Sequence, residues 1–367
     1  MTDPTPIPLF KVLMDPRAPD AVREVLLSGY TGEGQAVADF ETALQRTYGR
    51  PYLTMHSCTA ALEVAFDLCD VKSGDHVATT PATCTASNTG LVIRGAVPLW
   101  CDVDPITGLI DPNDVRKRIL RRPDRVKAII AVDWAGRLCD YDALESIGAE
   151  YGIPVIQDAA HRGPGPMRSP AYSTLSFQAI KFLNCGGDGG ALAVPDTTKH
   201  TEARLQRWYG LDRTSSASMR CAQNIGPIRA GRKAHMNNVA ASIGLANLVQ
   251  AVEAVVRTQE NARYYDEALR GLPNLVLPPP DPSCHYWLYT VLVRDRDGFI
   301  KFLGERGIES SPAHLRNDKH DAFYFPSGQL IGVDYFDSRQ TSIPVGWWVT
   351  EQDRKRIVEA VAAWCRR

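Results

Sequence analysis

Short apolar runs and helical stretches alternate between about residues 50 and 195, and this alternation limits the fold more than any other feature of the sequence. Several runs are almost continuously apolar, as is typical of parallel strands that are covered on both faces. The predicted strands cover residues 76–81, 97–104, 126–134, 153–160, 175–179 and 190–194. Helical stretches lie between some of them, at residues 59–70 and 141–152. This order predicts an α/β chain with a wound sheet, whose ligand-binding groups lie at the carboxyl ends of the strands.

The pattern changes after Val194, where long helical stretches replace the alternation. Two helices are predicted over residues 198–212 and 237–272, and the proline-rich segment 277–283 marks a break. The remaining chain predicts a strand over 285–295 and helices over 298–307 and 351–367. We therefore expect a large domain over residues 1–256 and a smaller α+β domain over residues 257–367.

Charge and composition exclude several classes of protein. The chain carries 41 Lys and Arg against 42 Asp and Glu, so we expect no nucleic-acid partner. The polar N-terminal segment 1–12 lacks the apolar core of a signal peptide, and polar residues interrupt the apolar stretch 238–256, which predicts no membrane span. Nine cysteines form no CxxC pair and no metal-like cluster with histidine, which favours reduced thiols in a cytoplasmic protein without a metal site.

Three short segments gather polar groups where the sheet would need them. Ser57, Cys58 and Thr59 precede an apolar helix, which fits either an ordinary N-cap or a phosphate site at a helix start. Asp158 ends an apolar strand, where a buried carboxylate needs a cation or a strong donor unless it is a satisfied structural residue. A single lysine, Lys181, stands before a glycine cluster, and taken alone it reads as a solvated side chain.

The order of these segments favours one cofactor. A helix start for the phosphate, a strand-end carboxylate for the pyridine nitrogen and a lysine for the aldehyde are what pyridoxal phosphate requires. In a fourth segment, residues 231–248, polar residues are followed by an apolar helix. This segment fits a loop and an N-cap unless the other three segments form one site. Because the three segments occur in the expected order, we expect pyridoxal 5'-phosphate as the cofactor.

The sequence also resembles a known family, the DegT/StrS-type sugar aminotransferases of the fold-type-I pyridoxal phosphate class. The segments that carry the resemblance span most of the chain: "TGEGQAVADFE", "HSCTAALEVAF", "SGDHVATTPATCTASN", "CDVDPITGLIDP", "AVDWAGRLCDYDAL", "IPVIQDAAHR", "LSFQAIKFLNCGGDGGAL", "RWYGLDR", "HMNNVAASIGLANL" and "SIPVGWW". The resemblance implies a large pyridoxal-phosphate-binding domain with a mostly parallel seven-stranded sheet, and a smaller α+β C-terminal domain. It also implies a homodimer with active sites at the subunit interface.

The resemblance assigns roles to individual residues. Lys181 matches the lysine that forms a Schiff base with the cofactor, Asp158 the partner of the pyridine nitrogen, and His161 a residue beside the cofactor ring and its phenolic oxygen. The implied catalytic residues are Lys181, Asp158 and His161. The implied cofactor-binding residues are Ser57, Cys58, Thr59, Cys84, Asp158, His161, Ser176, Lys181 and, reaching the phosphate in the partner subunit, His235.

Two positions depart from the family pattern. Cys58 stands where the family usually has glycine, and a side chain there costs about 1 kcal/mol if the backbone needs a positive φ. Cys84 stands near the place of an aromatic ring over the cofactor, so ring stacking has to come from elsewhere. Both departures concern how the cofactor is held.

The expected reaction is a double-displacement transamination. The resemblance implies glutamate or glutamine as the amino donor, and a keto-sugar, nucleotide-linked, or a keto-cyclitol as the acceptor. The expected substrate-side residues are Trp134, His314, Arg316 and Asn317, the last three on a charged segment that also fits a solvated loop. Burial is expected to lower the pKa of the Lys181 amine, which then acts as a base near neutral pH.

Three alternatives stay open. One is another pyridoxal phosphate reaction on the same scaffold, such as a sugar dehydratase or a lyase, although the family's sugar 3-dehydratases replace the lysine by histidine. The second is a non-catalytic sensor that keeps the cofactor fold, for which the sequence offers no DNA-binding segment. The third is a nicotinamide-dependent dehydrogenase, which the missing G-x-G-x-x-G motif disfavours.

Overall fold

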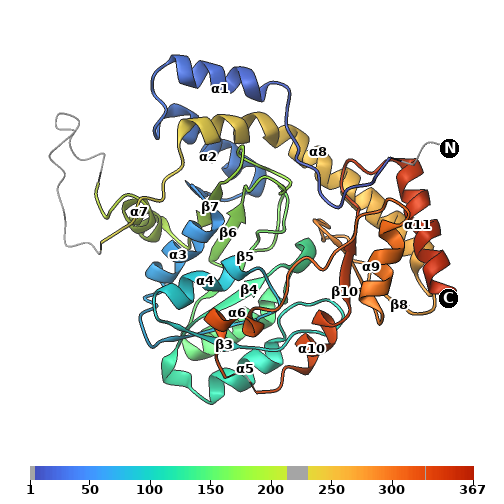
Figure 1. The fold of residues 1–367 in the computed structure, drawn as a ribbon. Coiled ribbons are helices and arrows are strands. Elements are labelled where there is room, and N and C mark those ends of the chain that lie inside the picture. Colours follow the sequence, from blue (N-terminus) through green and yellow to red (C-terminus); the bar gives the residue numbers. More distant parts are fainter. Residues whose placement is uncertain (1–4, 213–229, 327) are drawn as a thin grey trace.

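Two separate β-sheets organise the protein (Figure 1). The computed structural model describes residues 5–212, 230–326 and 328–367, so residues 1–4 of the N-terminal segment and Arg213 of the segment 207–213 lie outside it. The larger sheet contains β1 (Leu53–Met55), β2 (His76–Thr79), β3 (Val97–Trp100), β4 (Val126–Val132), β5 (Val155–Asp158), β6 (Tyr172–Ser176) and β7 (Gly190–Ala193). The smaller sheet contains β8 (Leu275–Val276), β9 (Tyr289–Val293) and β10 (Gln340–Ile343).

The larger sheet is mostly parallel, as expected. Its strand order is β1-β7-β6-β5-β4-β2-β3, and only the pairings of β7 with β1 and β6 are antiparallel. The parallel pairs bring the carboxyl ends of β4, β5 and β6 to one edge of the sheet. A ligand site is expected at this edge, because the strand ends point their backbone and side chains toward it.

Helices cover both faces of the larger sheet. The helices are α1 (Ala18–Leu27), α2 (Gln35–Tyr48), α3 (Cys58–Leu68), α4 (Thr85–Ile93), α5 (Pro112–Leu120), α6 (Tyr141–Tyr151), α7 (Thr197–Gln206), α8 (Asn238–Leu269), α9 (Arg296–Gly304), α10 (Ile331–Asp337) and α11 (Glu351–Cys365). Short 3₁₀ turns are η1 (Pro123–Arg125), η2 (Trp134–Gly136), η3 (Asn317–Lys319) and η4 (Asp321–Phe323).

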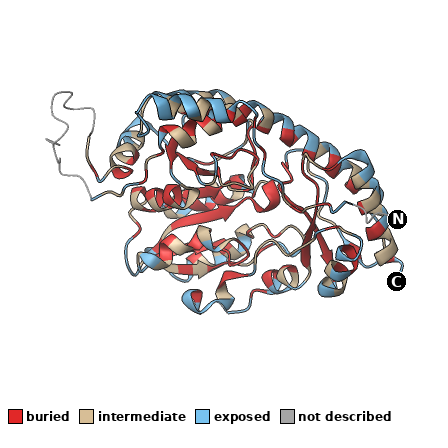
Figure 2. Ribbon diagram, turned by 45° about the horizontal axis from the view of Figure 1, so that its top comes forward, coloured by how far each residue is buried: buried red, intermediate tan, exposed pale blue. Residues whose placement is uncertain are grey.

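Strand β4 shows why two layers of helices are needed. Ala128 and Ile130 pack into one apolar cluster with α3, whereas Ile129 and Ala131 pack into another with α5 and α6. Successive strand residues point to opposite faces, so an apolar residue at every position requires cover on both sides. Figure 2 shows the buried strands between the helices.

Helix α8 connects the two sheets (Figure 1). Its beginning packs against α1 and α2, and its end packs against α11 and the core of the smaller sheet. The expected domain boundary between residues 256 and 257 falls inside this helix. Helix α8 is also long and apolar enough to cross a membrane by length and composition, and 44% of its most apolar stretch is buried inside the protein.

Several predicted element bounds need correction. The strand predicted over residues 97–104 ends at Trp100, and the strand predicted over residues 285–295 begins at Tyr289 and ends at Val293. The strand predicted over residues 175–179 is β6, which begins at Tyr172 and ends at Ser176, because its pairing places Ser176 opposite Gly190 of β7. The helix predicted over residues 198–212 ends at Gln206. The short strand β1 was not predicted, since three residues are too few to show a period. The helix predicted to end at Gly152 does so, with that glycine in the left-handed conformation.

Candidate active site

A cavity of about 330 Å³ opens at the carboxyl ends of β5 and β6. It is lined by nine of the predicted site residues: Ser57, Cys58, Thr59, Cys84, Asp158, His161, Ser176, Lys181 and His314. It is not lined by the other four predicted residues, Trp134, His235, Arg316 and Asn317. The structure therefore brings together most of the predicted site from elements far apart in the sequence.

One wall of the cavity is the N-terminus of α3. The Ser57 side chain caps this helix by accepting a hydrogen bond from the backbone N–H of Ala60 at 3.1 Å. Within the described residues, the backbone N–H groups of Cys58 and Thr59 have no hydrogen-bond acceptor. Such unsatisfied donors at a helix start bind anions.

Strand β7 lies directly against this turn. A Cβ atom on Gly190 would lie 2.3 Å from the backbone nitrogen of Cys58, so only glycine allows the approach. The strain expected at Cys58 is absent, because this residue opens α3 and is not among the described non-glycine residues with positive φ. The substitution of cysteine for glycine therefore has no backbone cost of that kind.

Asp158 is the buried acid of the cavity. It ends β5 and is 3% exposed. Its carboxylate accepts hydrogen bonds from the Ser87 hydroxyl at 2.7 Å and from the backbone N–H of Ala160 at 3.1 Å. Burial raises the pKa of Asp158, while these donors and the nearby Lys181 act against that rise. A cation above this carboxylate would stabilise its charged form.

Lys181 is half-buried, and its amine faces an aromatic ring. The Nζ atom lies 3.3 Å from the centre of the Trp287 ring. The indole N–H of Trp287 donates to the carbonyl of Ile180, next to the lysine in the chain, at 2.9 Å. Burial lowers the pKa of the Lys181 amine to about 8, in the predicted direction. A fraction of this amine is therefore neutral at physiological pH.

His161 lies between neighbouring rings. Its imidazole stacks on Trp287 with 4.1 Å between ring centres, and its Nε2 lies 3.4 Å from Nε2 of His314. Cys84, the residue before α4, also lines the cavity but contributes no ring. Among the described residues that line the cavity, Trp287 and the two histidines carry the rings that could face a flat cofactor.

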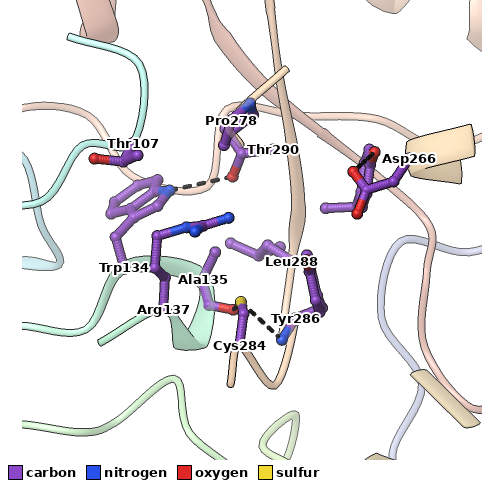
Figure 3. A pocket seen from close by; sticks show the side chains of 11 residues that line it. Thr107, Trp134, Ala135, Arg137, Asp266, Pro278, Cys284, Tyr286, Leu288 and Thr290 are labelled. Atoms are coloured by element: carbon purple, nitrogen blue, oxygen red, sulfur yellow. Dashed lines mark hydrogen bonds between the residues drawn. The ribbon is translucent and has the colours of Figure 1, made fainter. Parts of the chain in front are cut away.

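Trp134 stands behind the two histidines instead of lining the cavity. It contacts both of them edge to face, at 5.9 Å from His161 and 5.8 Å from His314. Figure 3 shows it in a second, smaller cavity, where its indole N–H donates to the Thr290 hydroxyl at 3.2 Å. Its polar group is therefore already satisfied within the protein.

Arg316 and Asn317 are buried and already hold protein partners. Arg316 binds Asp318 through two hydrogen bonds of 2.7 Å and also contacts Asp334. The amide of Asn317 donates to the Thr83 carbonyl at 2.7 Å and accepts from Asn88 at 2.8 Å. Both residues tie the segment around His314 to the larger sheet.

His235 lies outside the cavity, beside β1. It forms a β-bridge with Met55 and contacts the Trp208 ring edge to face at 4.4 Å. The resemblance places this residue in the site of the partner subunit, and this role stays a prediction.

Sequence reasoning missed two groups that contact the predicted residues. Trp287 lies in a segment predicted only as a strand, and no local pattern points from it to Lys181. Ser87 stands in the segment "TCTASN", where a hydroxyl could have been noticed as a partner for a buried carboxylate. Within the described residues, no group of three or more histidines, cysteines or acids could hold a metal ion.

These features suit pyridoxal phosphate. The open N–H groups at α3 are donors for a phosphate, the buried carboxylate of Asp158 suits a protonated ring nitrogen, and the half-buried amine of Lys181 suits a carbonyl carbon.

Comparison with known proteins also points to an aminotransferase. Residues 13–362 match the sequence model of the DegT/DnrJ/EryC1/StrS aminotransferase family. AtS13 from Actinomadura melliaura is 38% identical, with 98% of this chain and 99% of that chain covered and a TM-score of 0.91. The sugar aminotransferase CalS13 from Micromonospora echinospora is 32% identical, with coverage of 97% and 99% and a TM-score of 0.91. The aminotransferase TlmJ from Streptoalloteichus hindustanus is 27% identical, with coverage of 97% and 98% and a TM-score of 0.87.

The expected fold class and the expected resemblance are thereby confirmed. The chain belongs to the DegT/DnrJ/EryC1/StrS aminotransferase family, and its cofactor is pyridoxal phosphate.

Proposed function

We propose that this aminotransferase moves an amino group from glutamate or glutamine to a keto-sugar, nucleotide-linked, by double displacement. The observation that carries the proposal is the meeting of Lys181, Asp158 and the N-terminus of α3 in one cavity. Similarity to CalS13, which is called a sugar aminotransferase, supports a sugar acceptor over a keto-cyclitol.

The cofactor would be held at three points. The N–H groups of Cys58 and Thr59, with the hydroxyls of Ser57 and Ser176, would bind its phosphate. When bound, pyridoxal phosphate supplies an electron sink that stabilises negative charge on the substrate carbon. Asp158 would keep the ring nitrogen protonated, because its charged form is favoured beside a cation.

Lys181 would act twice. Its amine would bond to the cofactor in the resting enzyme, and after release by the amino donor it would move a proton at the substrate carbon. An amine with a pKa near 8 has the neutral fraction that a base needs at neutral pH. Such positioned proton transfer contributes roughly 10²- to 10⁴-fold to a rate.

The substrate side of the site would centre on His314, since it lines the cavity from the segment after α9. Trp134, Arg316 and Asn317 would act through it, because each packs around or anchors that segment and none of them lines the cavity.

The proposal includes a homodimer in the cytoplasm, without a nucleic-acid or membrane partner. Large apolar side chains are exposed on α1 and α8, among them Leu26, Leu27, Val249, Val252 and Val256. These two helices pack against each other, so their exposed side chains offer an apolar surface for a second subunit. His235 would reach the cofactor phosphate in the partner subunit.

A visible spectrum tests the proposed reaction. The purified protein is expected to be yellow, to lose that absorbance when glutamate or glutamine is added, and to regain it when the correct keto-sugar follows. Keto-cyclitols are screened in parallel. A yellow protein that no amino donor bleaches would point to a lyase, a dehydratase or a sensor, and would end the transaminase proposal.

Mixed dimers test the shared site. Lys181→Ala and His235→Ala subunits are each expected to be weakly active alone. In a mixed dimer, one site combines an intact Lys181 with an intact His235 from the other subunit, so mixing after mild dissociation should restore activity. If the mixture equals the sum of the two variants, His235 does not serve the partner's site.

A further inference from the structure

Two histidines meet in the cavity from opposite parts of the chain. His161 follows β5, His314 follows α9, and their Nε2 atoms lie 3.4 Å apart across 153 residues of sequence. Their rings are nearly parallel, with an angle of 15° between them. A hydrogen bond between two imidazole nitrogens requires one protonated and one unprotonated nitrogen.

A backbone group decides which nitrogen carries the hydrogen. The N–H of Ala135 lies 3.2 Å from Nδ1 of His161. Since a backbone N–H can only donate, Nδ1 of His161 holds no hydrogen, and the neutral ring carries its hydrogen on Nε2. His161 therefore donates to His314, and Nε2 of His314 is the acceptor. The hydrogen of neutral His314 must then be on Nδ1.

The turn that presents this N–H is fixed in an uncommon conformation. Ala135 has a φ of 57°, which costs a non-glycine residue about 1–2 kcal/mol. Asp133 supports the turn, because its carboxylate accepts from the backbone N–H of Cys139 at 3.1 Å and from the Tyr141 hydroxyl at 2.7 Å. Strained backbone of this kind persists only where the surroundings hold it, and it concentrates at functional sites.

The surroundings oppose protonation of either ring. A proton on Nδ1 of His161 would break the bond from Ala135, and a proton on Nε2 of His314 would break the bond between the histidines. Lys181 acts on both rings by its charge, and the acids Asp158 and Asp188 line the same cavity. Burial, with Lys181 adding to it, lowers the pKa of His314 to about 4 and that of His161 well below its usual value.

We propose that His314 is a neutral hydrogen-bond donor to an oxygen of the acceptor substrate, its tautomer fixed through His161 by the backbone N–H of Ala135. Nδ1 of His314 makes no hydrogen bond within the described part of the chain, and the side chain lines the cavity. A carbonyl or hydroxyl oxygen of a sugar is the chemistry that such a donor recognises. Ala135 and His161 are positioning residues in this arrangement.

The tautomers can be read directly in the intact holoenzyme. The protein is labelled with ¹⁵N-histidine, and long-range ¹H–¹⁵N spectra are recorded between about pH 5.5 and 8, where an ordinary histidine titrates. The signals of the two histidines are identified by their loss in His161→Gln and in His314→Gln. His320→Gln removes an exposed histidine between η3 and η4 and is the control for the loss of an unrelated signal. We expect His161 as the Nε2–H form and His314 as the Nδ1–H form, both unchanged with pH. His161 as the Nδ1–H form, or either ring charged at pH 6, overturns the proposal.

Kinetics test the contact with substrate, and this part rests on the proposed function. Glutamine can accept from His161 and still donate, so His314→Gln should keep KM for the keto-sugar within about threefold. His314→Phe keeps a ring but has no donor, and the loss of one neutral hydrogen bond should raise that KM by about 3- to 10-fold. Equal KM values for the two variants would exclude the contact. A protein that uses no keto-sugar at all would instead refute the proposed function and leave the tautomer result intact.

Discussion

The amine of Lys181 lies 3.3 Å from the centre of the Trp287 ring, whose own N–H is bonded to the carbonyl of Ile180. Trp287, which lies just before β9 of the smaller sheet, thus contacts both the amine of Lys181 and the backbone next to it. A cation over an indole face is stabilised by about 0.5–2 kcal/mol. Trp287 therefore gives the free amine a defined place within the cavity.

Removing this ring should slow the reaction. Trp287→Leu is expected to lower kcat of the glutamate half-reaction about 2- to 30-fold, because the released Lys181 amine loses the contact that positions it, an effect the size of one cation–π contact. Trp287→Phe keeps a ring face but not the N–H, so it should fall between that variant and the unaltered protein. Rates equal to those of the unaltered protein in both variants would show that the ring contact has no role.

The lowered pKa of Lys181 predicts how the apoenzyme takes up its cofactor. Only the neutral amine attacks the aldehyde, so the rate of reloading with pyridoxal phosphate should rise about tenfold per pH unit and level off above about pH 8. Nα-acetyl-lysine is the control, because its unburied amine keeps gaining reactivity up to about pH 10. A reloading rate that follows the control would mean that the cavity does not shift this amine.

Asp158 should matter through its charge more than through its hydrogen bonds. Asp158→Asn keeps the size of the side chain but leaves the ring nitrogen without a buried countercharge. Breaking such a pair costs about 3–5 kcal/mol, so stopped-flow measurement of the glutamate half-reaction should show a loss of at least about 100-fold. Ser87→Ala removes one hydroxyl donor but keeps the charge of Asp158, so its loss should be clearly smaller than that of Asp158→Asn. Similar losses in the two variants would speak against a charge role.

Asp133 should make the free energy of unfolding fall as the pH rises from about 4 to 6. Burial raises its pKa to about 6, so in this range the folded protein keeps a proton that the unfolded chain has released. Asp133→Asn cannot titrate, and the amide of Gln157 has an unpartnered buried oxygen that can accept from it after a flip. In urea unfolding, the free energy of unfolding of Asp133→Asn relative to the unaltered protein should therefore be higher at pH 7 than at pH 4, by about 2–3 kcal/mol.

The exposed Asp124→Asn is the matched control for this measurement. A pH-independent difference between Asp133→Asn and the unaltered protein would mean that the Asp133 carboxyl titrates normally.

Local sequence was sufficient where chemistry and periodicity coincide. Asp158 could be predicted because it ends an apolar strand, and the helix after Ser57 because small polar residues precede an apolar period. The end of β6 could not, since Phe177 is as apolar as the strand residues and only pairing with Gly190 sets the register.

The rest of the site depends on contacts between distant segments. Trp287 and Ile180 lie 107 residues apart, and His314 and His161 lie 153 residues apart. No spacing rule links such positions, because packing of α8 and the smaller sheet brings them together. The same packing places Trp134 and Arg316, which composition alone makes plausible substrate residues, against protein partners.

The most direct test of the role of Lys181 is to find which lysine carries the cofactor. The holoenzyme is reduced with borohydride, which makes the bond between lysine and cofactor permanent, then digested and analysed by mass spectrometry, with Lys181→Arg as the control. We predict the added mass on the peptide that contains Lys181, and none in the control. The added mass on another lysine, or its presence in the control protein, would contradict it.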